Sequence, residues 1–125
     1  MRKVISSELA PAAIGPYSQG IMTEKLVFTS GQIPINPASG KITAQTIEEQ
    51  TEQVMKNLKA VLAESGVGMD RIVKTTCFLS DMADFAAFNA VYGKYFPENA
   101  PARSCVQAAA LPMGAKVEVE CVAVR

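Results

Sequence analysis

Residues 46–79 read TIEEQTEQVMKNLKAVLAESGVGMDRIVKTTCFL, and this stretch holds the clearest helix and the clearest strand of the chain. Thr46 and Glu49 match a capping box, in which the two side chains satisfy free backbone amides at the start of a helix. Apolar residues then recur at helical spacing, and Gly66 ends the pattern. They are Ile47, Val54, Met55, Leu58, Val61 and Leu62. The segment Ile72–Leu79 is rich in β-branched and aromatic residues, which indicates a central strand.

Shorter elements are expected on both sides of this helix–strand unit. Prolines and glycines at residues 10–16 and 30–40 prevent regular pairing and predict loops. Ser80 and Asp81 open a second helix, which Pro97 stops and whose aromatic stripe most simply packs in the core. The stripe consists of Phe85, Phe88, Tyr92 and Phe96. Further strands are expected at residues 4–6, 17–23, 26–29, 103–109 and 116–124, with turns at 24–25 and 111–114.

The expected order of elements is β-β-β-α-β-α-β-β, which indicates a single α+β domain over residues 1–125 with one mixed sheet. Two helices separated by a single strand are expected on the same face of that sheet. The other face then stays open to water unless another molecule covers it, and large apolar patches seldom stay exposed on monomers. We therefore expect the chain to oligomerise.

The composition describes a globular protein without a strongly charged partner. Of the 125 residues, 49% are apolar and 19% are charged, and 12 basic residues balance 12 acidic ones. A balanced chain has no overall field to attract nucleic acid or an anionic membrane. No apolar stretch reaches membrane-spanning length, and the first residues lack the apolar core of a secretory signal. The expected partner is a small molecule, with no nucleic acid and no membrane.

Cysteine and histidine content narrows the chemistry. Cys77, Cys105 and Cys121 are widely spaced and form neither a disulfide framework nor a zinc pattern, so the expected location is the reducing cytoplasm. Histidine is absent, which excludes Ser-His-Asp and Cys-His catalysis of the ordinary kind and removes the commonest metal ligand. Cys105 therefore has no base to activate it, and we expect it to pack as a small hydrophobe.

Arg103 is the most informative single residue. It follows Pro101 and enters an otherwise apolar strand, where a guanidinium needs an anionic partner because burial of an unpaired charge is costly. Its forked donors suit a carboxylate. Two interpretations stay open: Arg103 binds a carboxylate ligand, or it forms a structural ion pair with Glu118 or Glu120.

The two glutamates alternate with valines and so share one face of the last strand. The turn at residues 111–114 is expected to fold that strand back beside Arg103, which brings a carboxylate near the guanidinium. That carboxylate could orient a water molecule as a base; alternatively, Glu118 and Glu120 both face solvent. The pattern does not decide the register of the hairpin.

Five segments resemble, in order and with the same spacings, signatures of the RidA (YjgF) family of reactive-intermediate deaminases. The likeness runs over nearly the whole chain. The segments are residues 14–19 (Ile-Gly-Pro-Tyr-Ser-Gln), 30–34 (Ser-Gly-Gln-Ile-Pro), 89–92 (Asn-Ala-Val-Tyr), 101–106 (Pro-Ala-Arg-Ser-Cys-Val) and 111–120, from Leu-Pro to Val-Glu-Val-Glu.

This resemblance implies a chorismate-mutase-like α+β fold assembled as a homotrimer, with ligand sites between subunits. It also implies hydrolytic deamination of 2-iminopropanoate and 2-iminobutanoate to 2-oxo acids and ammonia. Such imines derive from enamines that pyridoxal-phosphate-dependent dehydratases release, so the activity removes reactive intermediates. Neither a cofactor nor a metal is implied.

The resemblance also implies a role for individual residues. Arg103 matches the residue that binds the substrate carboxylate, and Glu118 matches the carboxylate that holds the attacking water. Gln107 and Met113 fall where the family varies, and we expect no function for them. The remaining matches are a backbone contact to the substrate carboxylate at Gly31, backbone polar groups at Cys105, and further pocket side chains at Tyr17, Ser30 and Asn89.

Other classes of function remain alternatives. The same pocket could hold a small carboxylate as a signal in a regulatory or chaperone-like protein. A translation-inhibiting ribonuclease is a further alternative. The neutral net charge and the absence of histidine argue against it, because RNA cleavage usually benefits from basic residues and an acid–base pair.

Overall fold

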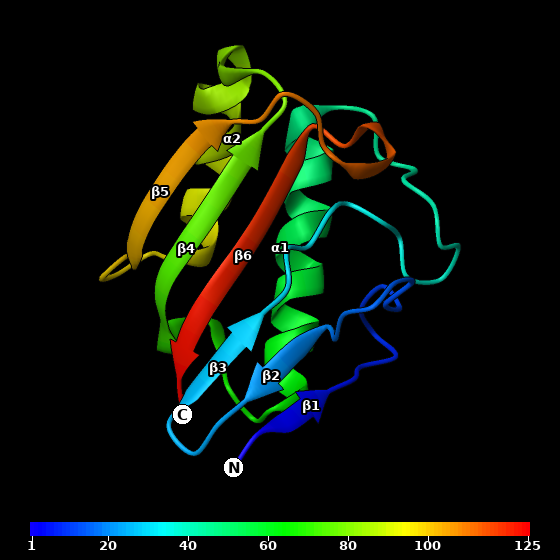
Figure 1. Ribbon diagram of the computed structural model, residues 1–125. Helices are drawn as coiled ribbons and strands as arrows, with labels where there is room; N and C mark the ends of the chain where they lie inside the picture. Colours follow the sequence, from blue (N-terminus) through cyan, green and yellow to red (C-terminus); the bar gives the residue numbers. More distant parts are fainter.

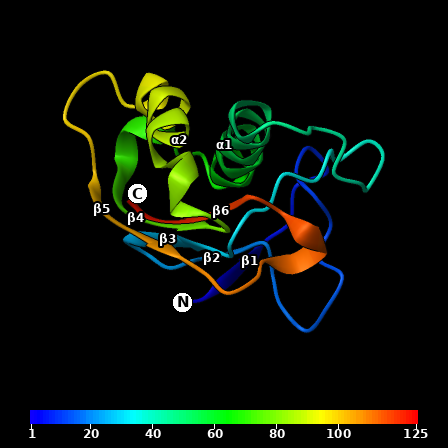
Figure 2. The ribbon, with the colours of Figure 1, turned by 90° about the horizontal axis from the view of Figure 1, so that it is seen from above.

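The computed structural model describes residues 1–125 as a six-stranded mixed sheet with two helices on one face (Figures 1 and 2). The strand order is β1-β2-β3-β6-β4-β5, and every neighbouring pair is antiparallel except β4–β5, which is parallel. The strands are β1 Lys3–Ile5, β2 Gly20–Met22, β3 Leu26–Thr29, β4 Ile72–Leu79, β5 Ala102–Gln107 and β6 Val117–Val124. The predicted α+β class and the single mixed sheet are confirmed.

Helix α1, Ile47–Glu64, forms as its local sequence predicts. The Thr46 hydroxyl accepts the backbone amide of Glu49 at 3.1 Å and donates to the Glu49 carboxylate at 2.9 Å, so the cap satisfies one amide rather than two. The predicted apolar stripe lies against the sheet. Val54, Met55, Leu58, Val61 and Leu62 are all fully buried there.

The second helix is shorter than predicted. Helix α2 covers Phe85–Tyr92 and continues at both ends as single 3-10 turns, Met82–Asp84 and Gly93–Tyr95. Asp81 caps the first of these turns, because its carboxylate accepts the amide of Ala83 at 2.9 Å. The aromatic stripe nevertheless packs in the core as expected, with Phe88 and Tyr92 buried and Phe85 and Phe96 partly buried against them.

Two predicted strand boundaries are wrong for local reasons. The strand expected at residues 17–23 begins only at Gly20, because Tyr17 closes a turn on Gly15 through a 2.8 Å backbone hydrogen bond. The strand expected at residues 103–109 ends at Gln107. The first and last strands, expected at residues 4–6 and 116–124, differ from the observed ones by one residue.

The predicted hairpin between the last two strands does not form. Residues 108–116 cross the end of β4, where Ala108 donates to the Leu79 carbonyl at 2.9 Å and Ser80 donates to the Lys116 carbonyl at 3.0 Å. Strand β6 therefore enters the sheet on the other side of β4, between β3 and β4, while β5 pairs with β4 at the sheet edge. The long antiparallel β4–β6 pairing, from Leu79–Val117 to Ile72–Ala123, replaces the expected local contact.

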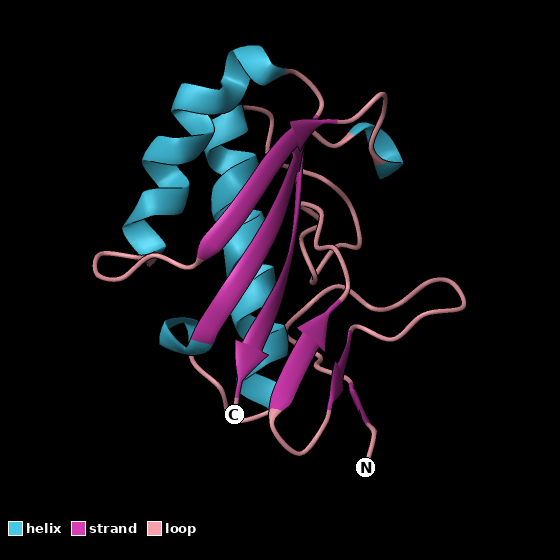
Figure 3. Cartoon of the chain, turned by 60° about the vertical axis from the view of Figure 1, so that its left-hand side comes forward, coloured by secondary structure: helices cyan, strands magenta, loops and turns pink.

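The face of the sheet away from the helices carries exposed apolar side chains. Figure 3 shows the strands in front of the helices, with no helix on the near side. Val4, Ile21, Phe28 and Val122 form one cross-strand row there, and Phe28 is 42% exposed. The open face that the order of elements predicts is thus present in the chain. Neither helix is both long enough and apolar enough to pass through a lipid bilayer.

Candidate active site

A cavity of about 520 Å³ lies where the loops after β1 and β3 meet the 108–116 connection and β6. Of the residues predicted from the sequence, Tyr17, Ser30, Gly31 and Glu118 all line it. They come from segments far apart in the chain, and the central position of β6 in the sheet brings them together.

Gly31 and Glu118 lie so close together that a side chain at position 31 would have to displace the Glu118 carboxyl group. A Cβ atom added to Gly31 would overlap the Glu118 carboxyl group, with Glu118 Cδ only 2.8 Å away. Glycine at position 31 thus leaves room for the observed position of the Glu118 side chain, and its backbone is not in the left-handed region. Burial raises the pKa of the Glu118 carboxyl above its ordinary value, and the nearby charge of Glu120 raises it further.

The loop that carries Tyr17 is held by Gln19, a residue whose role the sequence analysis missed. The Gln19 side chain is buried, accepts the Ser7 amide at 2.6 Å, and donates to the carbonyls of Ser7 at 3.0 Å and Pro11 at 2.7 Å. These groups belong to a loop and have no strand partner, so the amide replaces a sheet ladder. A glutamine directly before a strand and after a Pro-containing loop was the available signal.

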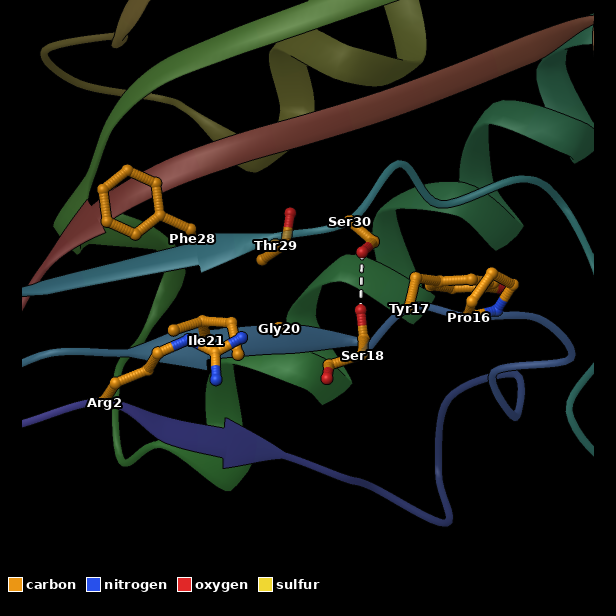
Figure 4. Close-up of a pocket in the computed structure, with 9 residues that line it drawn as sticks. All are labelled: Arg2, Pro16, Tyr17, Ser18, Gly20, Ile21, Phe28, Thr29 and Ser30. Atoms are coloured by element: carbon orange, nitrogen blue, oxygen red, sulfur yellow. Dashed lines mark hydrogen bonds between the residues drawn. The ribbon is translucent and has the colours of Figure 1, made fainter.

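The loop after β3 is tied to the same region by backbone hydrogen bonds. Ser30 donates its amide to the Gln19 carbonyl at 2.9 Å. The Ser30 hydroxyl donates to the Ser18 carbonyl at 2.6 Å (Figure 4). Gln32 exchanges two backbone hydrogen bonds with Val119 on β6, at 2.8 and 3.1 Å. These contacts fix Gly31 beside Glu118. Figure 4 also shows Tyr17 and Ser30 at a neighbouring hollow of about 410 Å³ on the open face.

Arg103 lies elsewhere, on edge strand β5 beside helix α2. Its Nη1 donates to Oδ1 of Asn89 at 2.7 Å. Its guanidinium carbon lies 4.9 Å from the ring centre of Tyr92 and 5.5 Å from that of Phe85. The half-buried cation is thus held by an uncharged amide and by aromatic faces, which stabilise a cation without neutralising it. Asn89 acts here as the partner of Arg103.

The expected proximity of Arg103 and Glu118 is wrong within one chain. Arg103 pairs with Thr75 of β4, which is fully buried on the helix side and hydrogen-bonds to Tyr92 at 2.7 Å. Glu118 pairs with Phe78, three residues further along β4, and therefore belongs to the opposite face. The interpretation of Arg103 as an internal ion pair with Glu118 or Glu120 fails for the same reason.

Cys105 follows Arg103 on the same side of β5 and is partly buried. Burial raises the pKa of its thiol, an effect that the nearby Arg103 opposes. A thiol with a raised pKa is a poor nucleophile at neutral pH, because the thiolate is the reactive form. This supports the prediction that Cys105 is not a nucleophile.

Comparison with known proteins gives consistent matches along the chain. Residues 7–125 match the protein-family model described as Endoribonuclease L-PSP. The chain is 51% identical over 122 residues to Reactive Intermediate Deaminase A, chloroplastic, of Arabidopsis thaliana, covering 98% of this chain and 65% of that protein. It is 44% identical over 125 residues to the 2-iminobutanoate/2-iminopropanoate deaminase of Mus musculus, covering 100% and 93%.

A protein of Lactococcus lactis named as a regulator, AldR, is 50% identical over 121 residues, covering 97% of this chain and 96% of that protein. Among solved structures, TdcF of E. coli with bound serine superimposes with a TM-score of 0.94 at 44% identity, covering 98% of both chains. The matches therefore include proteins named as deaminases and a protein named as a regulator.

Proposed function

Because the chain belongs to the RidA/YjgF/endoribonuclease L-PSP family, with relatives named as imine deaminases, we propose that it hydrolyses short-chain 2-imino acids to 2-oxo acids and ammonia. The substrates would be 2-iminopropanoate and 2-iminobutanoate, which arise from enamines released by pyridoxal-phosphate-dependent dehydratases. Their hydrolysis would remove reactive intermediates.

The observation that carries this proposal is the environment of Arg103. A half-buried guanidinium bonded to an uncharged amide keeps its positive charge available for an external anion. A 2-imino acid carries a carboxylate next to its reactive carbon, so binding of the carboxylate also positions the C=N bond. The bound serine in the TdcF structure, itself a small carboxylate, supports a ligand of this kind.

Glu118 is the best candidate for activating water. The carboxylate accepts a proton from water as the oxygen attacks C2 of the protonated imine, which forms a tetrahedral carbinolamine. Glu118 then delivers that proton to the nitrogen, and the C–N bond breaks as the C=O bond forms. The hydroxyl proton passes through the Glu118 carboxylate to the departing ammonia, which becomes ammonium. One water is consumed, and the products are the 2-oxo acid and ammonium. Gly31, with no side chain, leaves the carboxyl group accessible from the cavity.

Arg103 and Glu118 lie on opposite faces of the sheet, so the proposed chemistry needs two copies of the chain. We propose a homotrimer, the number implied by the family resemblance, in which the β5–α2 edge of one subunit meets the cavity of the next. Exposed apolar residues on the open face, including Phe28 and Val106, would be buried in such an assembly.

A coupled assay tests the function. An amino-acid oxidase generates the imine in place, and semicarbazide competes with the protein for it. We expect the protein to lower semicarbazone formation and to speed the appearance of 2-oxo acid. Unchanged semicarbazone formation at a protein concentration equal to that of the oxidase would contradict the proposal.

The same preparation separates the alternatives. Tight binding of 2-oxobutanoate without acceleration of imine hydrolysis would favour a small-carboxylate-binding regulator. The relative AldR is named as a regulator. Degradation of a defined RNA without imine hydrolysis would favour the activity in the family model's description. The absence of histidine and the balanced charge favour the imine hydrolase.

A further inference from the structure

The cavity that Glu118 lines has both polar and apolar lining residues. Polar groups from Ser30, Gln32 and the two glutamates gather along β6 and the loop after β3. The apolar part of its lining, which we call the apolar wall, consists of Pro11, Ile14, Ile33, Ile35, Pro112 and Met113. The cavity volume of about 520 Å³ lies within the range of about 300–1,000 Å³ found for sites of drug-sized ligands. Within one chain, a three-carbon imino acid is too small to contact all of these apolar residues at once.

Ile14 and Met113 stand out within this wall because both are exposed. Ile14 is 80% exposed and Met113 is 54% exposed, although each borders the cavity. Burial of such side chains against an apolar ligand is favourable in proportion to the area removed from water. A methyl substituent supplies little apolar area for such burial, whereas a chain of four carbons supplies more.

The backbone at Met113 is constrained while its side chain is adaptable. Met113 has a φ of 57°, a left-handed conformation uncommon outside glycine, asparagine and aspartate. The turn is held by a Pro112 carbonyl that accepts the Ala115 amide at 3.1 Å, and Gly114 follows with a φ of 66°. The unbranched thioether chain can then adjust to ligands of different shape, as methionine does at adaptable surfaces.

From these observations we infer that Met113, together with Ile14, forms a side-chain subsite that makes the protein prefer 2-imino acids with long apolar side chains over 2-iminopropanoate. The inference rests on the proposed imine hydrolysis. It assigns specificity to apolar residues that line the same cavity as Glu118 and that take no part in the proposed reaction.

The test compares 2-iminohexanoate with 2-iminopropanoate, generated by amino-acid oxidase from norleucine and alanine. For the wild-type protein we expect kcat/KM to be higher for 2-iminohexanoate by up to about sixtyfold, since this imine has three more methylenes and each buried methylene favours binding by about fourfold. Met113→Ser should lower kcat/KM for 2-iminohexanoate by about fivefold more than kcat/KM for 2-iminopropanoate, mainly through KM. Ile14→Ser should act in the same direction.

Met82 provides a matched control. It is 37% exposed on the turn before α2 and does not line the cavity, so Met82→Ser should leave the ratio unchanged. A wild-type ratio at or below one, or an equal loss for both imines in Met113→Ser, would overturn the subsite while the proposed hydrolase stands. Failure of the wild-type protein to hydrolyse either imine would overturn both.

Discussion

At the residue scale, Arg103 combines a full positive charge with neutral surroundings. Its hydrogen bond to Asn89 and its contacts with Tyr92 and Phe85 orient the guanidinium and leave the charge for a ligand. Arg103→Ala should lower kcat/KM for imine hydrolysis by more than about tenfold, because a charge-assisted hydrogen bond contributes about 1.5–3 kcal/mol. Arg103→Lys keeps the charge but loses the paired donors of the guanidinium, so its kcat/KM should also stay well below that of the wild-type protein. An Arg103→Ala protein of normal size and near wild-type rate would refute the assignment.

Asn89 allows a second test of whether the charge of Arg103 binds the ligand. Replacing the amide nitrogen of Asn89 by oxygen turns a neutral partner of Arg103 into a negatively charged one. Asn89→Asp preserves the shape of the side chain and gives Arg103 an internal counter-ion. We expect weaker binding of 2-oxobutanoate by about tenfold, since the guanidinium charge would be neutralised before the ligand arrives. Calorimetric titration of the two proteins measures this. Wild-type affinity in Asn89→Asp would show that the ligand does not depend on the charge of Arg103.

Glu118 should give activity a defined pH dependence. Burial raises the pKa of its carboxyl above the ordinary value of 4.5, so the proposed base is protonated at a pH where an exposed glutamate is already ionised. The rate of imine hydrolysis should therefore rise with pH through the raised pKa. Glu120→Gln removes the second cause of the shift and should move this rise to lower pH. A rate profile identical in both proteins would argue against Glu118 as the titrating base.

The raised pKa of Glu118 should affect stability in the direction opposite to its effect on activity. Between the ordinary and the raised pKa, the folded chain binds a proton at Glu118 that the unfolded chain has released, so the free energy of unfolding falls as pH rises. Glu118→Gln should remove this part of the decrease in urea titrations at a series of pH values. Activity and stability thus respond to the same proton in opposite directions, which separates a functional carboxyl from a purely structural one.

At the scale of elements, the approach of the 30–35 loop to β6 depends on the missing side chain of Gly31. Gly31→Ala should destabilise the fold by about 0.5–1.5 kcal/mol, because the added methyl forces the Glu118 side chain out of its observed position. In a Glu118→Ala background the obstacle is gone, and the same substitution should cost much less. Urea unfolding of the four proteins gives the coupling between the two positions. If the two substitutions have additive effects on the free energy of unfolding, the 30–35 loop moves away from β6 instead of displacing the Glu118 side chain.

Local and non-local elements differ in how far the sequence predicts them. Helix α1 was predicted because its cap and its stripe are set within a few residues of each other. Strand β2 was predicted too long, since the turn at Tyr17 and the buried contacts of Gln19 are invisible to an alternation pattern. The β5–β6 hairpin was wrong because pairing partners are chosen by the whole sheet, and β4 accommodates both strands.

In the candidate site, too, some residues were grouped correctly from the sequence and others were not. The resemblance grouped Tyr17, Ser30, Gly31 and Glu118, and the cavity brings these residues together within one chain. Pattern reasoning placed Arg103 beside a glutamate through the hairpin, and the parallel β4–β5 pairing places it on the other face. Face assignment requires register, which hydrophobic alternation does not specify for a short edge strand.

At the scale of the whole molecule, the separation of Arg103 from Glu118 predicts that activity is shared between chains. Mixing inactive Arg103→Ala and Glu118→Ala proteins, after unfolding and refolding together, should restore activity. In a closed ring each site takes Arg103 from one subunit and Glu118 from its neighbour, so about a quarter of the sites in a random equal mixture would be intact. Refolding each variant alone gives the baseline, and light scattering reports the assembly. No recovery in mixed assemblies of the normal size would show that the two residues do not complete one site across an interface.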